Sequence, residues 1–109
     1  MIIYHDIILN NTITNGEYTA IIDNFNTLKN NNQQEYFIIL YKLQDKFENG
    51  KVIKQYIFTK RQAKILMASC CLDIEESYDF PSCLDGCRLK ITIKNSKVIY
   101  TEPIPNKYV

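Results

Sequence analysis

The sequence predicts a mainly β protein in which five strands and one α-helix follow the order β-β-β-α-β-β. Three observations carry this prediction: three alternating apolar runs before residue 59, a complete helix-capping signal directly after them, and two further alternating runs near the end. With 109 residues, 46% hydrophobic and 23% charged, the chain has the length and composition of one globular domain. We therefore expect a single domain, 1–109, with its core over about residues 16–101 and flexible termini.

The first strand follows a turn signal at Gly16 and is predicted over residues 17–23. A polar stretch, residues 26–34, then interrupts the alternation and predicts a mobile loop whose only charged residue is Lys29. Such a loop between the first two strands often holds a ligand in small barrels. The buried side of the first strand is predicted to carry Tyr18, Ala20 and Ile22.

The second strand is predicted over residues 35–43 and the third over residues 51–58, joined by a hairpin that contains Gly50. Apolar residues occupy every second position of the second strand, which predicts that this side is buried. These residues are Phe37, Ile39, Tyr41 and Leu43. The opposite side carries Tyr36, Ile38, Leu40 and Lys42.

The helix is predicted to begin after Thr59, whose hydroxyl caps the first turn while Gln62 returns a bond to the backbone of Thr59 in a capping box. Residues 73–81 form an acidic, irregular link. In the fourth strand, residues 88–94, basic and apolar residues alternate, and a fifth strand is predicted over residues 98–101. The helix side that faces the sheet is predicted to carry Ala63, Leu66, Met67 and Cys70.

This order of elements is the plan of a five-stranded Greek-key β-barrel with one α-helix, the oligonucleotide/oligosaccharide-binding (OB) fold. Barrels of this plan usually bind a ligand across an open face of the sheet. The function is therefore to be sought on a surface.

No catalytic constellation is visible in the sequence. The only histidine, His5, lies far along the chain from any Cys-Asp or Ser-Asp group, and no Gly-rich loop is present to hold a phosphate. The cysteines at 70 and 71 are adjacent and those at 83 and 87 lie four residues apart, so neither pair has the spacing of a zinc knuckle. We predict a protein that is not an enzyme, holds no metal or cofactor, and uses its cysteines as small hydrophobic side chains.

Charge and hydropathy limit the partners. The formal net charge of +1 argues against a binder that works through overall positive charge. No apolar run approaches the ~20 residues that span a bilayer, and the N-terminal residues lack the basic region and cleavage site of a signal peptide. We expect a cytoplasmic protein that does not bind membranes.

Binding of a single nucleic-acid strand needs positive groups that meet phosphates and exposed aromatic rings on which bases stack for ~1–3 kcal/mol each. The outward sides of the second and third strands, and the hairpin between them, offer both. The basic row of the fourth strand, Arg88, Lys90 and Lys94, is interpreted as a solvated face or as an edge that deters strand pairing. The predicted nucleic-acid-binding residues are Tyr36, Lys42, Lys51, Lys54 and Tyr56, with Phe25 and Lys29 contributed from the first loop.

In order and spacing, residues 16–101 resemble the small single-stranded-DNA-binding proteins of phages and mobile genetic elements. The resemblance implies a non-catalytic, sequence-tolerant protein with an OB fold that binds single-stranded DNA in replication or recombination of a phage or mobile element. Many such proteins end in a long acidic tail that recruits replication partners, whereas residues 103–109 contain no acidic run. The segments that carry the resemblance are GEYTA (16–20), EYFII (35–39), GKVIKQYIF (50–58) and LDGCRLKITI (84–93).

A second hypothesis is a small phage or mobile-element protein that binds and inhibits a host protein, for example a defence nuclease. Tyrosine is enriched in the energetically dominant positions of protein interfaces, and this chain has 8 tyrosines. Lysines around stacked tyrosines favour DNA, whereas a contiguous apolar patch favours a protein partner or a homodimer. The sequence leaves monomer and homodimer open. The patch in question comprises Ile38, Leu40, Val52 and Phe58.

Overall fold

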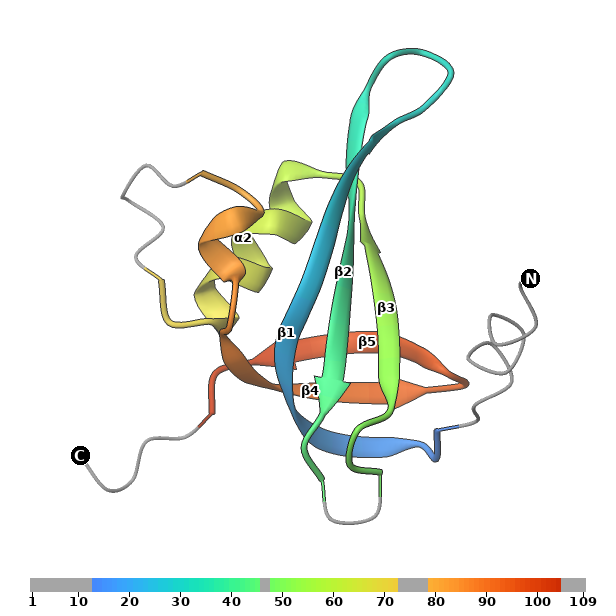
Figure 1. The fold of residues 1–109 in the computed structure, drawn as a ribbon, viewed down its shortest axis with the longest axis vertical. Helices are drawn as coiled ribbons and strands as arrows, with labels where there is room; N and C mark the ends of the chain where they lie inside the picture. Colours follow the sequence, from blue (N-terminus) through green and yellow to red (C-terminus); the bar gives the residue numbers. More distant parts are fainter. Residues whose placement is uncertain (1–12, 46–47, 73–78, 105–109) are drawn as a thin grey trace.

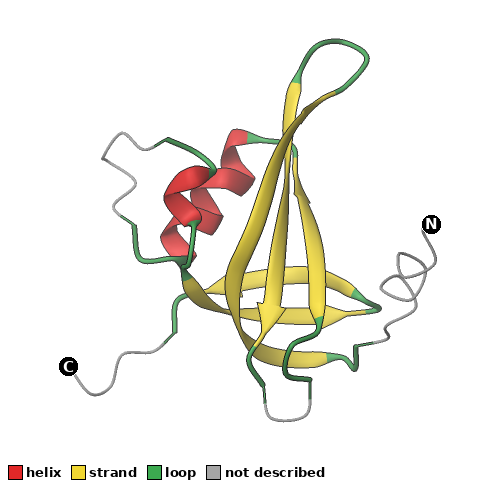
Figure 2. Cartoon of the chain, viewed as in Figure 1, coloured by secondary structure: helices red, strands yellow, loops and turns green. Residues whose placement is uncertain are grey.

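The computed structural model describes residues 13–45, 48–72 and 79–104 (Figure 1). Within them lie five antiparallel strands, one α-helix and one short 3-10 helix (Figure 2). The prediction of a mainly β protein with one α-helix between the third and fourth strands is confirmed. The expectations for His5, for residues 73–78 of the acidic link and for residues 105–109 lie outside the described residues. The elements are β1 (Gly16–Lys29), β2 (Glu35–Leu43), β3 (Val52–Ile57), α2 (Lys60–Ser69), η1 (Ser82–Leu84), β4 (Arg88–Lys94) and β5 (Lys97–Glu102).

The strands form one sheet in the order β3-β2-β1-β4-β5, and every neighbouring pair is antiparallel. The first half of β1 pairs with β4, where Tyr18 lies opposite Ile91, and the second half pairs with β2, where Phe25 lies opposite Ile39. The sheet thereby curls into a half-barrel, with β4 and β5 crossing the direction of β2 and β3 (Figure 1). The two edge strands, β3 and β5, come into contact with each other without being hydrogen-bonded neighbours in the described sheet.

A β-bulge at Asp23 marks the corner at which β1 leaves β4. The register with β2 shifts between Ile22 and Asn24, so that Asp23 is the extra residue. The backbone N–H of Ile22 donates to the carbonyl of Cys87 at 2.8 Å, and the N–H of Gly86 donates to the carbonyl of Ile22 at 3.1 Å. Gly86 has a φ of 75°, which glycine adopts without steric cost. Since a bulge bends its strand, β1 can pair with both β4 and β2.

The loop predicted over residues 26–34 is wrong in its first half, because β1 continues to Lys29 and only residues 30–34 form the turn. Backbone pairing explains the difference. Lys29 lies opposite Glu35, and the polar residues before it are paired with β2 through their main chain on a projecting hairpin (Figure 1). The side chain of Asn30 closes the turn, since its Oδ1 accepts from the N–H groups of residues 32 and 34 at 2.8 and 3.0 Å.

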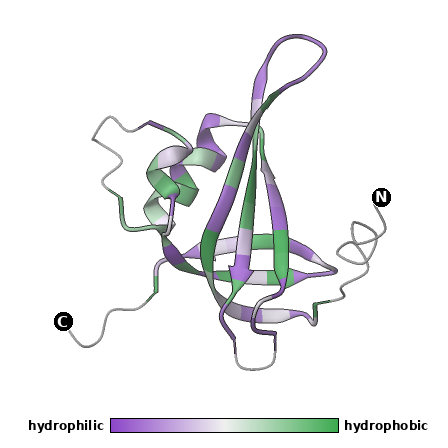
Figure 3. Ribbon diagram, viewed as in Figure 1, coloured by the Kyte–Doolittle hydropathy of each residue, from purple (hydrophilic) through white to green (hydrophobic). Residues whose placement is uncertain are grey.

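The core lies between the inward side of the sheet and α2, and the alternation of hydropathy along the strands is visible in Figure 3. The predicted inward sides of β1 and β2 are confirmed, with Phe37 partly buried and the other six residues buried. At its centre Tyr41 donates its hydroxyl to Oε1 of Gln55, and burial raises the pKa of Tyr41 far above its ordinary value. The buried hydrophobic residues are Ile13, Tyr18, Ala20, Ile22, Ile39, Tyr41, Leu43, Ile53, Ile57, Leu66, Leu84, Leu89, Ile91 and Ile93.

The predicted capping box of α2 is confirmed. Oγ1 of Thr59 accepts from the N–H of Gln62 at 3.1 Å, and Oε1 of Gln62 accepts from the N–H of Thr59 at 3.1 Å. The helix places Leu66 in the core and packs Ala63, Met67 and Cys70 against it. Within the part of the chain that the structure describes, no helix has both the length and the apolar character needed to cross a membrane.

Candidate nucleic-acid interface

The outward sides of β2 and β3 form one continuous surface, opposite the core. Its cross-strand pairs alternate aromatic, apolar and basic character: Ile38 lies opposite Tyr56, and Leu40 lies opposite Lys54. The outward positions of these two strands contain no Asp or Glu. They are Tyr36, Ile38, Leu40 and Lys42 on β2, and Val52, Lys54 and Tyr56 on β3.

Three aromatic rings meet at one end of this surface and form what we call the aromatic cluster: Tyr36, Tyr56 and Phe58. The ring centroids of Tyr36 and Phe58 lie 5.4 Å apart, those of Tyr56 and Phe58 lie 5.9 Å apart, and the latter two rings are stacked with 20° between their planes. Tyr56 is 43% exposed and Phe58 62% exposed. The cluster is therefore partly open to solvent at Tyr56 and Phe58, and its three rings contact one another.

The structure brings two of the predicted lysines to the same surface as the aromatic cluster. Lys42 and Lys54 are both exposed at outward positions, and Lys54 is two residues from Tyr56 on β3. Neither lysine makes a salt bridge with another described residue. No Asp or Glu occupies an outward position of β2 or β3, so neither lysine faces a carboxylate across these two strands.

Lys51 differs from these two lysines. Its Nζ lies 2.9 Å from a carboxylate oxygen of Glu48 in the β2–β3 hairpin, and its side chain is half-buried. This ion pair offsets its charge. Lys51 also precedes β3, so it stands at the opposite end of that strand from Phe58.

Phe25 and Lys29 lie in strand β1 and not in a loop, so the placement predicted for them is wrong. Phe25 pairs with Ile39 on the inward side of the sheet and is partly buried against the core. Lys29 is exposed opposite Glu35, next to the hairpin turn. Neither belongs to the aromatic cluster, and their contact with nucleic acid stays a prediction.

The basic row on β4 has partners within the protein. Nζ of Lys90 lies 3.0 Å from Oε1 of Glu17 on β1, and this hydrogen bond raises the pKa of Lys90. Nε of Arg88 donates to Oε1 of Gln44 at 3.0 Å. The interpretation of this row as an edge is wrong, because β4 lies between β1 and β5 in the sheet, and the contacts of Lys90 and Arg88 agree with a solvated face.

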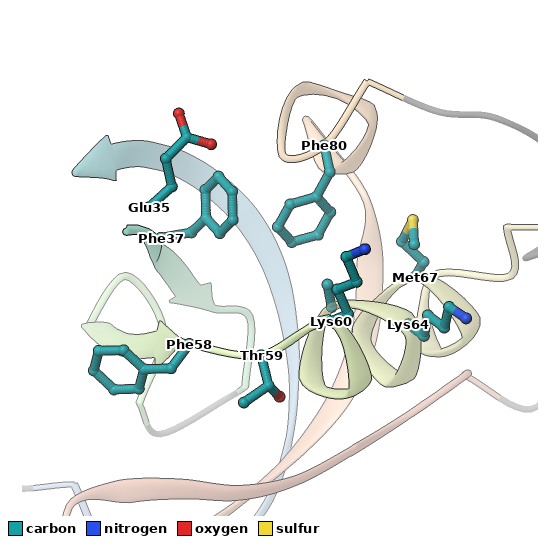
Figure 4. A pocket seen from close by; sticks show the side chains of 9 residues that line it. Glu35, Phe37, Phe58, Thr59, Lys60, Lys64, Met67 and Phe80 are labelled. Atoms are coloured by element: carbon teal, nitrogen blue, oxygen red, sulfur yellow. The ribbon is translucent and has the colours of Figure 1, made fainter. Parts of the chain in front are cut away.

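A pocket of about 380 Å³ opens beside the aromatic cluster, between α2, the start of β2 and Phe80 (Figure 4). The rings of Phe37 and Phe80 meet edge to face across it, with centroids 4.9 Å apart and 83° between planes. Sequence reasoning missed this pocket, because Phe37 and Phe80 come from segments far apart in the chain and no local pattern joins them. Its lining residues are Glu35, Phe37, Phe58, Thr59, Lys60, Ala63, Lys64, Met67 and Phe80.

The cysteines give no metal-binding arrangement in the described parts of the chain, where no group of three or more His, Cys, Asp or Glu residues is placed to hold an ion. All four cysteines are free. Cys71 is exposed and the other three are partly buried. Burial raises the pKa of Cys70 and of Cys83, which disfavours their thiolate forms.

Comparison with protein-family models and with curated proteins finds no match to this chain.

Proposed function

We propose that this protein binds single-stranded DNA across the outward side of β2 and β3, without catalysis and with tolerance for base sequence. The observation that carries the proposal is the aromatic cluster, partly exposed to solvent, with Lys54 next to it and Lys42 at the far end of the same surface, whose outward β2 and β3 positions hold no Asp or Glu. Stacking uses the π-face that every base possesses, and lysines meet the phosphates that every nucleotide carries. Neither contact selects a sequence.

We further infer that the half-barrel is a Greek-key barrel of the OB type. The strand order β3-β2-β1-β4-β5, the contact between β3 and β5, and the position of α2 between β3 and β4 support this inference. In barrels of this type the face of the second and third strands is a common binding surface. The aromatic cluster lies on that face.

The proposal favours a single strand over a duplex for a physical reason. Bases within a duplex are stacked on one another, so their faces are not free to meet the rings of Tyr56 and Phe58. A net charge of +1 also supplies little of the general attraction that dominates duplex binding. The resemblance to single-stranded-DNA-binding proteins adds the biological setting that we propose: replication or recombination of a phage or mobile element in the cytoplasm.

The test is fluorescence anisotropy of a labelled ~30-nucleotide single strand and of the matching duplex, titrated with protein at two salt concentrations. We expect the single strand to bind more tightly, with log affinity falling against log salt by ~0.7 for each phosphate contact. Equal or absent binding of both probes would contradict the proposal.

A second candidate function is binding of a host protein, or self-association as a homodimer. Apolar side chains also share the outward surface: Leu28, 38% exposed, lies opposite Tyr36 on β1, and Ile38, Leu40 and Val52 are partly exposed. Light scattering of the protein alone measures whether it forms a dimer. If it does, the substitution Ile38→Lys should yield a monomer. A dimer that persists in this variant would exclude the patch as its interface.

A further inference from the structure

The pocket beside α2 and the aromatic cluster share one residue, Phe58. Its ring packs against Tyr36 and Tyr56 on the outward side of the sheet, and the same residue lines the pocket. In Figure 4 the ring of Phe58 turns away from the pair formed by Phe37 and Phe80, towards the sheet side. A ligand that crosses the aromatic cluster therefore arrives at the mouth of the pocket, where the chain passes from β3 into α2.

The interior of the pocket is apolar and partly aromatic. Phe37 and Phe80 form the edge-to-face pair, and Ala63 and Met67 of α2 complete the wall. All four are only partly buried, so the pocket opens to solvent. Its volume of about 380 Å³ lies in the lower part of the range that small-molecule sites occupy.

The rim of the pocket is predominantly basic. Lys60 and Lys64 stand one helical turn apart and are both exposed, and among the residues that the structure describes Glu35 is the only carboxylate that lines the pocket. The first turn of α2 contains Lys60 and Arg61 and no acidic residue. Cations at this end oppose the helix dipole, so helix stability does not account for their presence.

We propose that this pocket receives one nucleobase of the bound single strand, while Lys60 and Lys64 hold the phosphates that flank it. The inference rests on the proposed function. An aromatic and apolar interior suits the face of a base, and a rim with two lysines and one carboxylate suits an anionic backbone more than a neutral peptide. The strand turns from the aromatic cluster into the pocket at Phe58, and the binding site ends at α2.

Two pairs of variants test this inference, each with a control that changes the same chemistry elsewhere. Ala63→Leu fills the pocket, whereas Ala68→Leu adds the same atoms at an exposed position of the same helix. The double variant Lys60→Glu and Lys64→Glu, called the rim variant below, reverses the charge of the two lysines at the rim of the pocket. The double variant Lys94→Glu and Lys97→Glu makes the same charge change at exposed positions of β4 and β5.

The readout is anisotropy with a labelled ~20-nucleotide poly-dT strand, longer than the ~4–16 nucleotides that one OB fold covers. We expect Ala63→Leu to lower the affinity about 5-fold or more, the value of one lost stacking contact. The rim variant should also reduce the salt slope by roughly 1.4, the loss of two phosphate contacts. Both controls should bind like the wild type.

A strand that is abasic at every position gives an independent measurement, because no register can then supply a base to the pocket. This strand should bind the wild type more weakly than poly-dT does, and Ala63→Leu should not weaken its binding further. If Ala63→Leu does not fold, the rim variant decides, because its side chains are exposed. Normal binding by the pocket and rim variants, with weakened binding by Tyr56→Ala, would overturn this inference and leave the proposed function intact. Absence of binding by the wild-type protein would overturn both.

Discussion

The hydroxyl of Ser69 on α2 lies 2.7 Å from the hydroxyl of Thr101 on β5, and both residues are buried. Ser69 also lies 2.9 Å from the carbonyl oxygen of Ile65, to which it donates. Because serine has a single hydroxyl hydrogen, Thr101 must be the donor to Ser69. This pair joins the helix to the edge strand that approaches β3.

Because Thr101 donates to Ser69, removal of the Ser69 hydroxyl should lower the free energy of unfolding more than removal of the Thr101 hydroxyl. Ser69→Ala leaves the buried Thr101 hydroxyl without its acceptor and should lower the free energy of unfolding by about 1–3 kcal/mol. Thr101→Val keeps the shape of the side chain and leaves Ser69 bonded to Ile65, so its cost should be smaller. Urea denaturation of both variants measures the difference, and a larger cost for Thr101→Val would reverse the assigned donor.

The outward surface of β3 provides the principal test of DNA binding. The double variant Lys54→Glu and Tyr56→Ala should weaken single-strand binding about tenfold or more, because it removes one stacking surface and replaces one positive charge by a negative one. Both side chains are exposed, so the melting temperature should change little. The control is Lys97→Glu with Tyr100→Ala on β5, where Tyr100 is also exposed. Equal losses in both double variants would refute a specific role for β3.

Burial of Tyr41 predicts a loss of stability at alkaline pH. Its pKa is raised in the folded state by burial, so the unfolded chain releases this proton first once the pH exceeds the ordinary value of 10.0. Stability is therefore retained below pH 10 and falls above it, by up to about 1.4 kcal/mol per pH unit for this group. Tyr41→Phe cannot titrate, and its stability should fall less steeply between pH 9 and about pH 11. Identical slopes for variant and wild type would contradict this account.

The cysteines should react at different rates with a thiol reagent at neutral pH. Cys71 is exposed, whereas burial raises the pKa of Cys70 and Cys83 and so lowers their thiolate fraction. We expect one fast equivalent followed by slow reaction of the rest. Cys71→Ser should remove the fast phase, and a fast phase that survives this change would mean that another thiol is open to the reagent.

The parts of the fold that the sequence predicts well are those in which one local pattern decides the structure. The bounds of β2 agree with the alternation of residues 35–43, since the inward positions from Phe37 to Leu43 are apolar or aromatic. The start of α2 agrees because Thr59 and Gln62 satisfy each other's backbone groups without help from the rest of the chain. The alternation of β2 and the capping box of α2 are each confined to one short segment of the chain.

The parts that the sequence does not predict depend on contacts between distant segments. The second half of β1 is too polar to be recognised as a strand and is held by main-chain pairing with β2. In the candidate site, Tyr36 and Tyr56 could be predicted from alternation, whereas the pocket formed with Phe80 could not. A segment that lies beyond α2 in sequence supplies Phe80, and only folding brings it to Phe37.

The double pairing of β1 also bears on how the chain reaches this structure. The pairs β1–β2, β2–β3 and β4–β5 each join strands that are consecutive in sequence, whereas the pair β1–β4 encloses β2, β3 and α2. Closing so long a loop costs entropy before its contacts form, and topologies of this kind fold slowly. We therefore expect the slow step of folding to be formation of the β1–β4 pair, in which Ile22 contacts the turn at Gly86 and Cys87. Until it occurs, the two halves of the sheet are separate, and neither has a complete core.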